Sequence, residues 1–234
     1  MKEQDYRFWV DRIGYSNKLF DIIRIDHFRA FDTYWKIPAD CPTAIDGEWI
    51  EAPGYEVIDT LQKEIPGLDL VAEDLGLLRP EVLMLKDHYH LKGMKVLEFA
   101  FDSRDSGCAS DYLPHNYPEN CVAYTGTHDN ETIVGWWKSI TAAERKLARD
   151  YLCDHATPEE ELYKCFISLI MRSAARVCVI PMQDYMGLDN RFRMNKPSTV
   201  GMNWKWRIKK RDLTKKLQKE IHDVTLRYGR KNWD

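Results

Sequence analysis

The chain has 234 residues and a formal net charge of −3 at pH 7; 44% of the residues are hydrophobic and 30% are charged. This length can bury one large core, and the composition is that of an ordinary globular protein. The nearly balanced charge gives no reason to expect nucleic acid or an anionic membrane as partner, and no apolar run approaches the roughly 20 residues that span a bilayer.

The N-terminal residues contain no apolar stretch of the kind found in a secretory signal peptide. The six Cys are scattered without a CxxC pair, which is typical of reduced thiols in a cytosolic protein. We therefore predict a cytoplasmic protein, or a plastid one if the source is a plant. The seven His form no HxxxH or HExxH pair, so we predict no metal site.

Apolar residues recur about every 3.6 positions over residues 5–19, which predicts an amphipathic helix. The β-branched run at 21–28 predicts a strand, and its alternation puts Arg24, Asp26 and Phe28 on one face. An Arg and an Asp on the inward face of a buried strand are costly unless they pair or contact a polar ligand. This strand therefore either contains a structural ion pair or forms part of a functional site.

The rest of the chain alternates between predicted strands and helices. Thr141 and Thr157 each precede a helical pattern and have Glu three positions later, so we expect both to be N-caps. The aromatic-rich stretch at 30–53 is a long loop, which in a compact domain is usually functional. Further strands are predicted at 68–76, 94–101, 121–125 and 176–184, and further helices at 55–65, 80–91, 141–153, 158–173 and 208–228.

Five strands separated by helices, each followed by polar residues, predict a parallel α/β architecture. Acidic residues at successive strand ends favour a (β/α)8 TIM barrel, in which the chemistry is built at that face. An open doubly wound sheet is the alternative, but no GxGxxG or P-loop follows any strand to support nucleotide binding.

Three carboxylates at three strand ends suit the cleavage of a glycosidic bond with retention of configuration. Asp26 fits the nucleophile, because Arg24 on the same face would hold it ionised. Glu73 fits the acid/base with a raised pKa, and Asp74 fits a hydrogen-bonding neighbour of Glu73. Asp129 could bind sugar hydroxyls and stabilise an oxocarbenium-like charge.

Four loop residues are weaker candidates for contacts with a sugar. Trp35 and Trp204 could stack on glucose rings, or they could simply pack against the protein. His115 and Asn116 could bind sugar hydroxyls, or they could form a turn beside Pro114.

Several of these stretches resemble motifs of one enzyme family. Residues 24–29, 72–76 and 124–130 look like the three acidic motifs of the 4-α-glucanotransferases, also called amylomaltases or disproportionating enzymes. These enzymes form glycoside hydrolase family 77 of the α-amylase clan. Residues 112–117 and 193–207 are similar to further blocks of the same family, and the five blocks occur in the same order.

The resemblance implies Asp26 as nucleophile, Glu73 as acid/base and Asp129 as transition-state stabiliser. It implies transfer of α-1,4-glucan segments to the 4-hydroxyl of another glucan or of glucose, without a metal or an organic cofactor. The expected partners are therefore a glucan donor and a glucose or maltooligosaccharide acceptor. The expected substrate-binding residues are Arg24, His128, His115, Asn116, Trp35 and Asn195.

The resemblance covers the family's barrel from the fourth strand onward. We therefore expect residues 1–234 to be a partial catalytic domain that lacks the first three strands, without a separate second domain. Two other functions stay open. The chain could be an α-amylase-like retaining hydrolase, or an inactive, truncated fragment that binds glucan.

Overall fold

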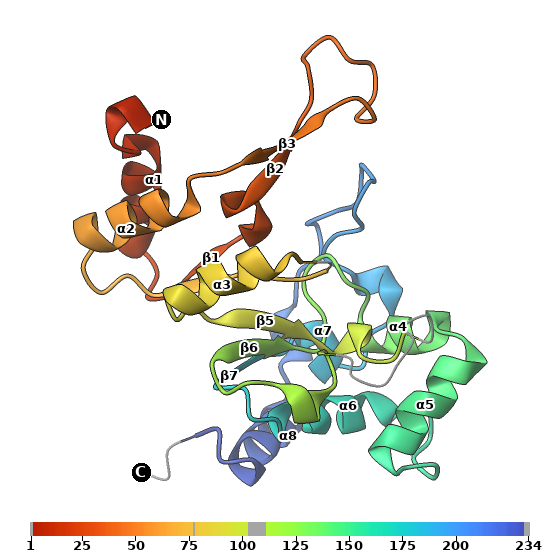
Figure 1. Ribbon diagram of the computed structural model, residues 1–234. Coiled ribbons are helices and arrows are strands. Elements are labelled where there is room, and N and C mark those ends of the chain that lie inside the picture. Colours follow the sequence, from red (N-terminus) through yellow and green to blue (C-terminus); the bar gives the residue numbers. More distant parts are fainter. Residues whose placement is uncertain (1, 77, 103–110, 232–234) are drawn as a thin grey trace. The chain divides into compact units, whose positions relative to one another are not determined.

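Figure 1 shows the computed structural model of the chain, which describes residues 2–76, 78–102 and 111–231. Contacts between Cα atoms divide the chain into two compact units, Met1–Met94 and Lys95–Asp234. Each unit has a hydrophobic core of its own. The predicted mixture of strands and helices is confirmed in both.

The first unit combines helices on a parallel strand pair with an antiparallel hairpin. β1 and β4 pair in parallel, with Ile25 opposite Ala72, and an isolated parallel bridge joins Val71 to Lys92. β2 and β3 pair antiparallel. The elements are η1 (Lys2–Gln4), α1 (Arg7–Asn17), β1 (Ile23–Ile25), η2 (Phe28–Phe31), β2 (Thr33–Lys36), β3 (Glu48–Glu51), α2 (Gly54–Glu64), β4 (Leu70–Ala72) and α3 (Pro80–His88).

β1 follows the predicted alternation only as far as Ile25. Both of its isoleucines are buried while Arg24 between them is half-buried, as the period of two requires. The strand then ends, His27 adopts a left-handed φ of 50°, and Phe28 becomes fully buried in η2. The prediction that Phe28 shares a face with Arg24 and Asp26 is therefore wrong, because the extended backbone stops before it.

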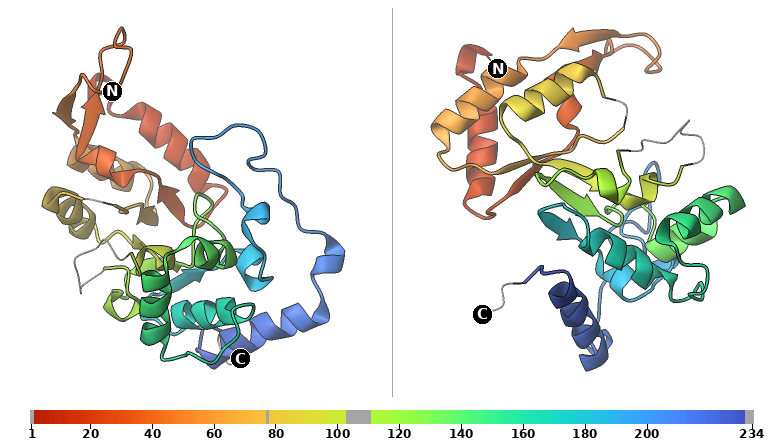
Figure 2. Two further views of the ribbon diagram at one scale, coloured as in Figure 1. Left: turned by 90° about the vertical axis from the view of Figure 1, so that its right-hand side faces the viewer. Right: turned by 60° about the horizontal axis from the view of Figure 1, so that its bottom comes forward.

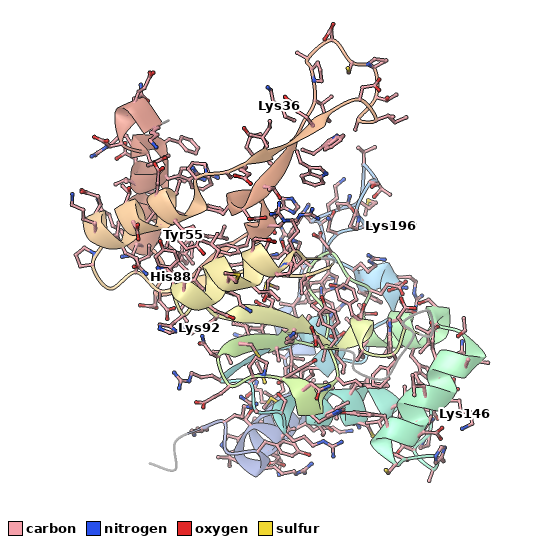
Figure 3. The ribbon with its side chains drawn as sticks, viewed as in Figure 1. Lys36, Tyr55, His88, Lys92, Lys146 and Lys196 are labelled. Carbon is pink, nitrogen blue, oxygen red and sulfur yellow. The ribbon has the colours of Figure 1, made fainter. Side chains whose placement is uncertain are left out.

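The stretch predicted as a loop at 30–53 contains the β2–β3 hairpin, which the sequence did not suggest. Trp35 and Trp49 are partners across the hairpin, with ring centroids 5.3 Å apart in an edge-to-face arrangement. At the next position Lys36, labelled in Figure 3, pairs with Glu48 at 3.1 Å. Cross-strand aromatic and opposite-charge pairs of this kind stabilise an antiparallel ladder.

The second unit is built on a three-stranded sheet in the order β5-β6-β7, with β6 and β7 parallel. Figure 2 shows a long extended excursion of the chain before the last helix. The elements are β5 (Gly93–Val96), η3 (Leu97–Phe99), η4 (Pro114–Asn116), β6 (Cys121–Tyr124), α4 (Ile133–Ser139), α5 (Ala142–Leu152), α6 (Leu162–Met171), β7 (Val177–Val179), α7 (Met182–Tyr185), η5 (Asn190–Phe192), η6 (Lys210–Asp212) and α8 (Lys215–Arg227).

The two threonines expected to cap helices behave differently. Thr141 caps α5 in a complete capping box with Glu144, as predicted. Thr157 does not cap α6, which begins five residues later at Leu162; its hydroxyl donates instead to Asp154 Oδ2 at 2.6 Å. Helix α4 was not predicted from the sequence; Thr132 caps it by accepting a hydrogen bond from the N–H of Gly135.

The strands are shorter than predicted, because helical turns take up their ends. The predicted strand at 94–101 passes into η3, and the one at 176–184 passes into α7. Five cysteines in the described ranges are free thiols, and Cys108 lies outside those ranges. Within the described residues no helix combines the length and apolar character needed to cross a membrane.

Candidate active site

β1 and β4 bring two acidic residues together in the first unit. Because Ile25 and Ala72 are partners in a parallel pair, the residues that follow them, Asp26 and Glu73, leave the same edge of that pair. Arg24 Nη2 lies 2.7 Å from Asp26 Oδ1, which confirms the predicted pairing along the strand. The Asp26 side chain is 77% exposed, so it is open to a ligand. We call Asp26 and Glu73 the acid pair.

Backbone amides hold the carboxylate of Glu73. Its Oε2 accepts from the N–H of His27 at 2.7 Å, and its Oε1 accepts from the N–H of Leu75 at 3.2 Å. The left-handed turn at His27 therefore links the end of β1 to the side chain after β4. Burial raises the pKa of Glu73 above its ordinary value, although these amides and Arg24 act in the opposite direction.

Asp74 does not serve as the predicted hydrogen-bonding neighbour of Glu73. Its side chain is buried, pairs with Lys86 of α3 at 2.9 Å and accepts from the N–H of Met94 at 2.6 Å. Gly93 makes this possible, because a Cβ there would lie 2.4 Å from Asp74 Oδ2. Asp74 thus ties β4 to α3 and to the start of β5, which is a structural role.

The third predicted acid, Asp129, lies in the second unit on the loop after β6, residues 125–131, which we call the Asp129 loop. Asn195 Nδ2 donates to Asp129 Oδ1 at 2.6 Å, and the Asn195 N–H donates to the backbone oxygen of His128 at 3.1 Å. His128 Nε2 lies 3.3 Å from Asp129 Oδ2. The structure therefore groups His128, Asp129 and Asn195, all three of which the sequence singled out.

Asn195 belongs to residues 189–207, which we call the return segment. Lys196, labelled in Figure 3, also lies on it, and its N–H donates to Asn203 Oδ1 at 3.0 Å. The Trp204 ring lies 5.1 Å from the His128 ring, and the Trp204 side chain remains about half exposed. Trp204 thus contacts the Asp129 loop, and its exposed area is available to a flat ligand.

Two buried acids that were not predicted from the sequence support this part of the second unit. Asp184 accepts from the Thr125 hydroxyl at 2.5 Å and from the N–H of Ile133 at 2.8 Å, and burial raises its pKa to about 6. Glu98 is 8% exposed, and burial, with the charges of Asp184 and Glu131, raises its pKa well above the ordinary value. Both acids stand inside apolar runs without a spacing that marks them.

Asn190 anchors the return segment against α4. Its Nδ2 donates to Glu131 Oε1 at 2.6 Å, and its Oδ1 accepts from the N–H of Thr132 at 3.3 Å. A Cβ at Gly135 would lie 2.0 Å from Asn190 Oδ1, so the close approach requires glycine.

The remaining predicted residues make other contacts. His115 is exposed, and its Nδ1 lies 2.9 Å from the Tyr151 hydroxyl of α5. Asn116 is in the same turn, η4, with its N–H bonded to the backbone oxygen of Leu113. Trp35 is in the hairpin of the first unit, where its Nε1 donates to the backbone oxygen of Ala44 at 2.9 Å. These contacts neither support nor oppose sugar binding.

The acid pair combines two carboxyl groups in different surroundings. Asp26 is exposed and lies beside the Arg24 guanidinium. Glu73 is half-buried with a raised pKa, which favours the form that can donate a proton. The described residues contain no group of three or more His, Cys, Asp or Glu that could hold a metal ion.

The sequence and the structure both match known proteins. The 4-alpha-glucanotransferase family pattern (glycoside hydrolase family 77) matches residues 1–214. The 4-alpha-glucanotransferase of Thermus thermophilus is 43% identical over 213 residues, which cover 89% of this chain and 42% of the relative. The chloroplastic/amyloplastic 4-alpha-glucanotransferase of Solanum tuberosum is 39% identical over 233 residues, 98% of this chain and 40% of the relative.

Among solved structures, the amylomaltase of Streptococcus agalactiae in complex with acarbose superimposes with a TM-score of 0.92 at 37% identity. The match covers 99% of this chain and 46% of that one. The amylomaltase of Corynebacterium glutamicum, at 18% identity and a TM-score of 0.67, is similar in fold. The chain thus spans less than half the length of these relatives, and it belongs to the 4-alpha-glucanotransferase family, glycoside hydrolase family 77.

Proposed function

We propose that the chain is part of a retaining 4-α-glucanotransferase. It would move α-1,4-glucan segments to the 4-hydroxyl of an acceptor glucan or of glucose, with Asp26 as nucleophile, Glu73 as acid/base and Asp129 as transition-state stabiliser. The observation that carries the proposal is the acid pair, in which an exposed carboxylate beside Arg24 neighbours a half-buried carboxyl with a raised pKa. Family membership supplies the reaction for which such a pair is suited.

The reaction would run in two displacements. Asp26 attacks the anomeric carbon, the glycosidic C–O bond breaks, and Glu73 gives its proton to the leaving oxygen. The glucan segment is then held as an ester on Asp26. In the second step the Glu73 carboxylate takes the proton of the acceptor 4-hydroxyl, whose oxygen attacks the same carbon and releases Asp26. The two steps balance, because the second returns the proton to Glu73 and frees the Asp26 carboxylate.

Other polar groups would support these steps. Arg24, 2.7 Å from Asp26 Oδ1, would orient the Asp26 carboxylate for its attack. Asn195 fixes one carboxylate oxygen of Asp129, and His128 contacts the other, which leaves the loop shaped for sugar hydroxyls. The relative solved with acarbose shows that a family member binds an oligosaccharide-like ligand, and we extend that binding to this chain.

We also propose that β1, β4, β5, β6 and β7 are the fourth to eighth strands of a (β/α)8 barrel. Residues 1–234 would then be one partial catalytic domain. The parallel pairs β1–β4 and β6–β7 are consistent with such a barrel. The coverage of 46% of the Streptococcus agalactiae chain fits a segment of this size. We also propose a cytoplasmic location, or a plastid one for a plant source, as the name of the chloroplastic/amyloplastic relative of Solanum tuberosum suggests for the latter.

Trapping the ester tests the assignment of the acid pair. A glycosyl fluoride needs little protonation of its leaving group, so the Glu73→Gln variant treated with maltosyl fluoride should accumulate a maltosyl adduct. Intact-mass and peptide mass spectrometry should locate the adduct on Asp26. The double variant Asp26→Asn/Glu73→Gln is the matched control and should carry none. Absence of the adduct from the single variant, or its presence in the control, would contradict the proposed roles.

Product analysis separates transfer from hydrolysis. With maltotriose as sole substrate, a transferase yields glucose together with oligomers longer than maltotriose, whereas a hydrolase yields only shorter sugars. Chromatography of the products from the unsubstituted chain decides between the two. Longer oligomers support the transferase, and their absence in the presence of maltose and glucose would support the hydrolase.

A further inference from the structure

Arg193 lies where the Asp129 loop meets the return segment, both within the second unit. Its Nη2 donates to the backbone oxygen of Asp129 at 2.9 Å, and its Nε donates to the backbone oxygen of Asn195 at 3.2 Å. One rigid, planar guanidinium therefore holds two backbone segments that are 66 positions apart, as the Asn195–Asp129 bond also does. Its side chain is only 17% exposed, so little water competes for these bonds.

The bonds of Arg193 and Asn195 form a closed ring around Asp129. Arg193 fixes the backbone of both Asp129 and Asn195, and the Asn195 side chain fixes the Asp129 carboxylate at 2.6 Å. The N–H of Asn195 adds a bond to the backbone oxygen of His128. Rotation of the Asp129 carboxylate would therefore break the Asn195 bond unless the return segment moved as well, and Arg193 prevents that movement.

The charge of Arg193 faces a carboxylate other than Asp129. Glu131 Oε1 lies 3.8 Å from Arg193 Nη1 and is itself held by Asn190. Arg193 thus lies beside the charge of Glu131, while its hydrogen bonds fix the backbone around Asp129.

We propose that Arg193 is a positioning residue for the reaction. Its two hydrogen bonds, to the backbone oxygens of Asp129 and Asn195, hold the Asp129 carboxylate in the orientation that stabilises charge on the sugar ring. This inference rests on the proposed function for its catalytic consequence, but the positioning itself is a property of the second unit. Arg193 acts through Asp129 and Asn195 and does not need to touch the sugar.

The test uses the whole chain with three variants. Arg193→Gln removes the charge and the fork, whereas Arg193→Lys keeps a charge but cannot bond both carbonyl oxygens in the same plane. Arg191→Gln is the matched control, because Arg191 is two positions away, 81% exposed and bonded only within its own segment to Asp189. Circular dichroism and thermal unfolding first establish that each variant is folded.

Hydrogen–deuterium exchange measures the positioning without any need for activity. Both Arg193 variants should speed exchange about tenfold or more in peptides covering residues 125–131 as well as 189–204, since bonds from a charged donor are lost on both sides. Arg191→Gln should change exchange less than twofold in residues 125–131. Unchanged exchange there in both Arg193 variants overturns the proposal, and wild-type behaviour of Arg193→Lys overturns the role of the fork.

Ligand binding then measures the catalytic consequence. Acarbose has a flattened ring that imitates the transition state, whereas maltotriose imitates the ground state. By calorimetry, Arg193→Gln should weaken acarbose binding at least tenfold and maltotriose binding less than threefold. Equal losses for the two ligands overturn the catalytic part. Failure of the unsubstituted chain to bind either ligand contradicts glucan binding by this chain on its own and supports the inactive fragment, while the exchange measurement still decides the positioning.

Discussion

The acid pair of the first unit and Asp129 of the second unit are held in different ways. Glu73 is fixed by backbone amides of His27 and Leu75, and Asp26 by an Arg two residues earlier on the same strand. Asp129 is fixed by side chains of Arg193 and Asn195, which come from a segment far along the chain. The first arrangement is set by how β1 and β4 end, and the second by how the return segment docks.

The difference has a physical consequence for mutation. A backbone N–H remains when the side chain is changed, except on substitution by proline, so the acid pair depends mainly on the backbone conformation and on the buried residues that support it. The Asp129 loop depends on particular side chains, so single substitutions far away in sequence can disorganise it. The predictions below test this contrast, from the largest expected effect to the smallest.

Asp26→Asn should lower the rate of maltotriose disproportionation by at least about a thousandfold, roughly 4 kcal/mol, because an amide is not a comparable nucleophile. Product formation is measured against the unsubstituted chain. Thermal unfolding serves as the control and should change little, since Asp26 is exposed and its pair with Arg24 lies largely in water. Residual turnover above about a thousandth of the parent rate would remove Asp26 from the role of nucleophile.

Lys86→Met should destabilise the protein by about 3–5 kcal/mol, because it leaves the buried Asp74 carboxylate without its partner. Urea unfolding measures the loss, with Lys63→Met on the exposed face of α2 as the control. A large loss of stability in Lys86→Met would sharpen the comparison between the two units. It would show that the first unit, in which backbone amides hold Glu73, depends on the buried Lys86–Asp74 ion pair. A loss no larger than that of the control would show that water compensates Asp74.

Asp184→Asn should make the stability less dependent on pH. The folded pKa of Asp184 is about 6 against an ordinary value of 3.8, so its stabilising contribution is complete below pH 3.8 and is lost as pH rises through 6. Relative to the parent, the variant should therefore gain up to about 3 kcal/mol between pH 4 and pH 7. Unfolding by urea at both pH values measures this.

The amide of the variant can still accept the bond from Ile133 and can donate to the Thr125 hydroxyl, so the geometry is retained. A stability difference that does not change with pH would mean that Asp184 titrates normally in the folded state. That outcome would weaken the contrast between the two units, because the second unit would then lack a buried acid with a raised pKa beside the Asp129 loop.

His27→Val should cost about 1–2 kcal/mol, because a β-branched residue is poorly tolerated at the φ of 50° found there. His27→Gly is the matched control, should lie within about 1 kcal/mol of the parent and keeps the N–H that bonds Glu73. Thermal unfolding of the two variants provides the comparison. If valine and glycine have equal effects, the left-handed turn is not what holds Glu73.

Local patterns in the sequence predicted the first unit better than the second. The alternation in β1 was sufficient to pair Arg24 with Asp26, and the strand-end position was sufficient to place Glu73 beside them. The capping box at Thr141 was found for the same reason, while the similar pattern at Thr157 failed because Asp154 competes for its hydroxyl. Each of these features depends on residues a few positions apart or on the ends of neighbouring strands.

Long-range contacts were beyond the reach of such patterns. Arg193 begins a block that resembles a family motif, but its neighbours in sequence do not show what it contacts, and only the folded chain shows that its side chain is largely buried beside Asp129 while Arg191 is exposed. Glu98 and Asp184 sit among apolar residues, and their importance comes from burial, which depends on the packing of the whole second unit. The β2–β3 hairpin was missed because aromatic residues and prolines within 30–53 were interpreted as a loop.

Gly135 shows how routine stabilisation could go wrong in this protein. Replacing a glycine inside a helix with alanine is a common engineering step, since it typically gains about 1 kcal/mol of helix propensity. Here the added methyl group would meet Asn190, 55 positions later, at 2.0 Å. A design procedure that scored α4 alone would favour the substitution. The cost would fall instead on the return segment, because Asn190 would have to give up its hydrogen bonds to Glu131 and Thr132.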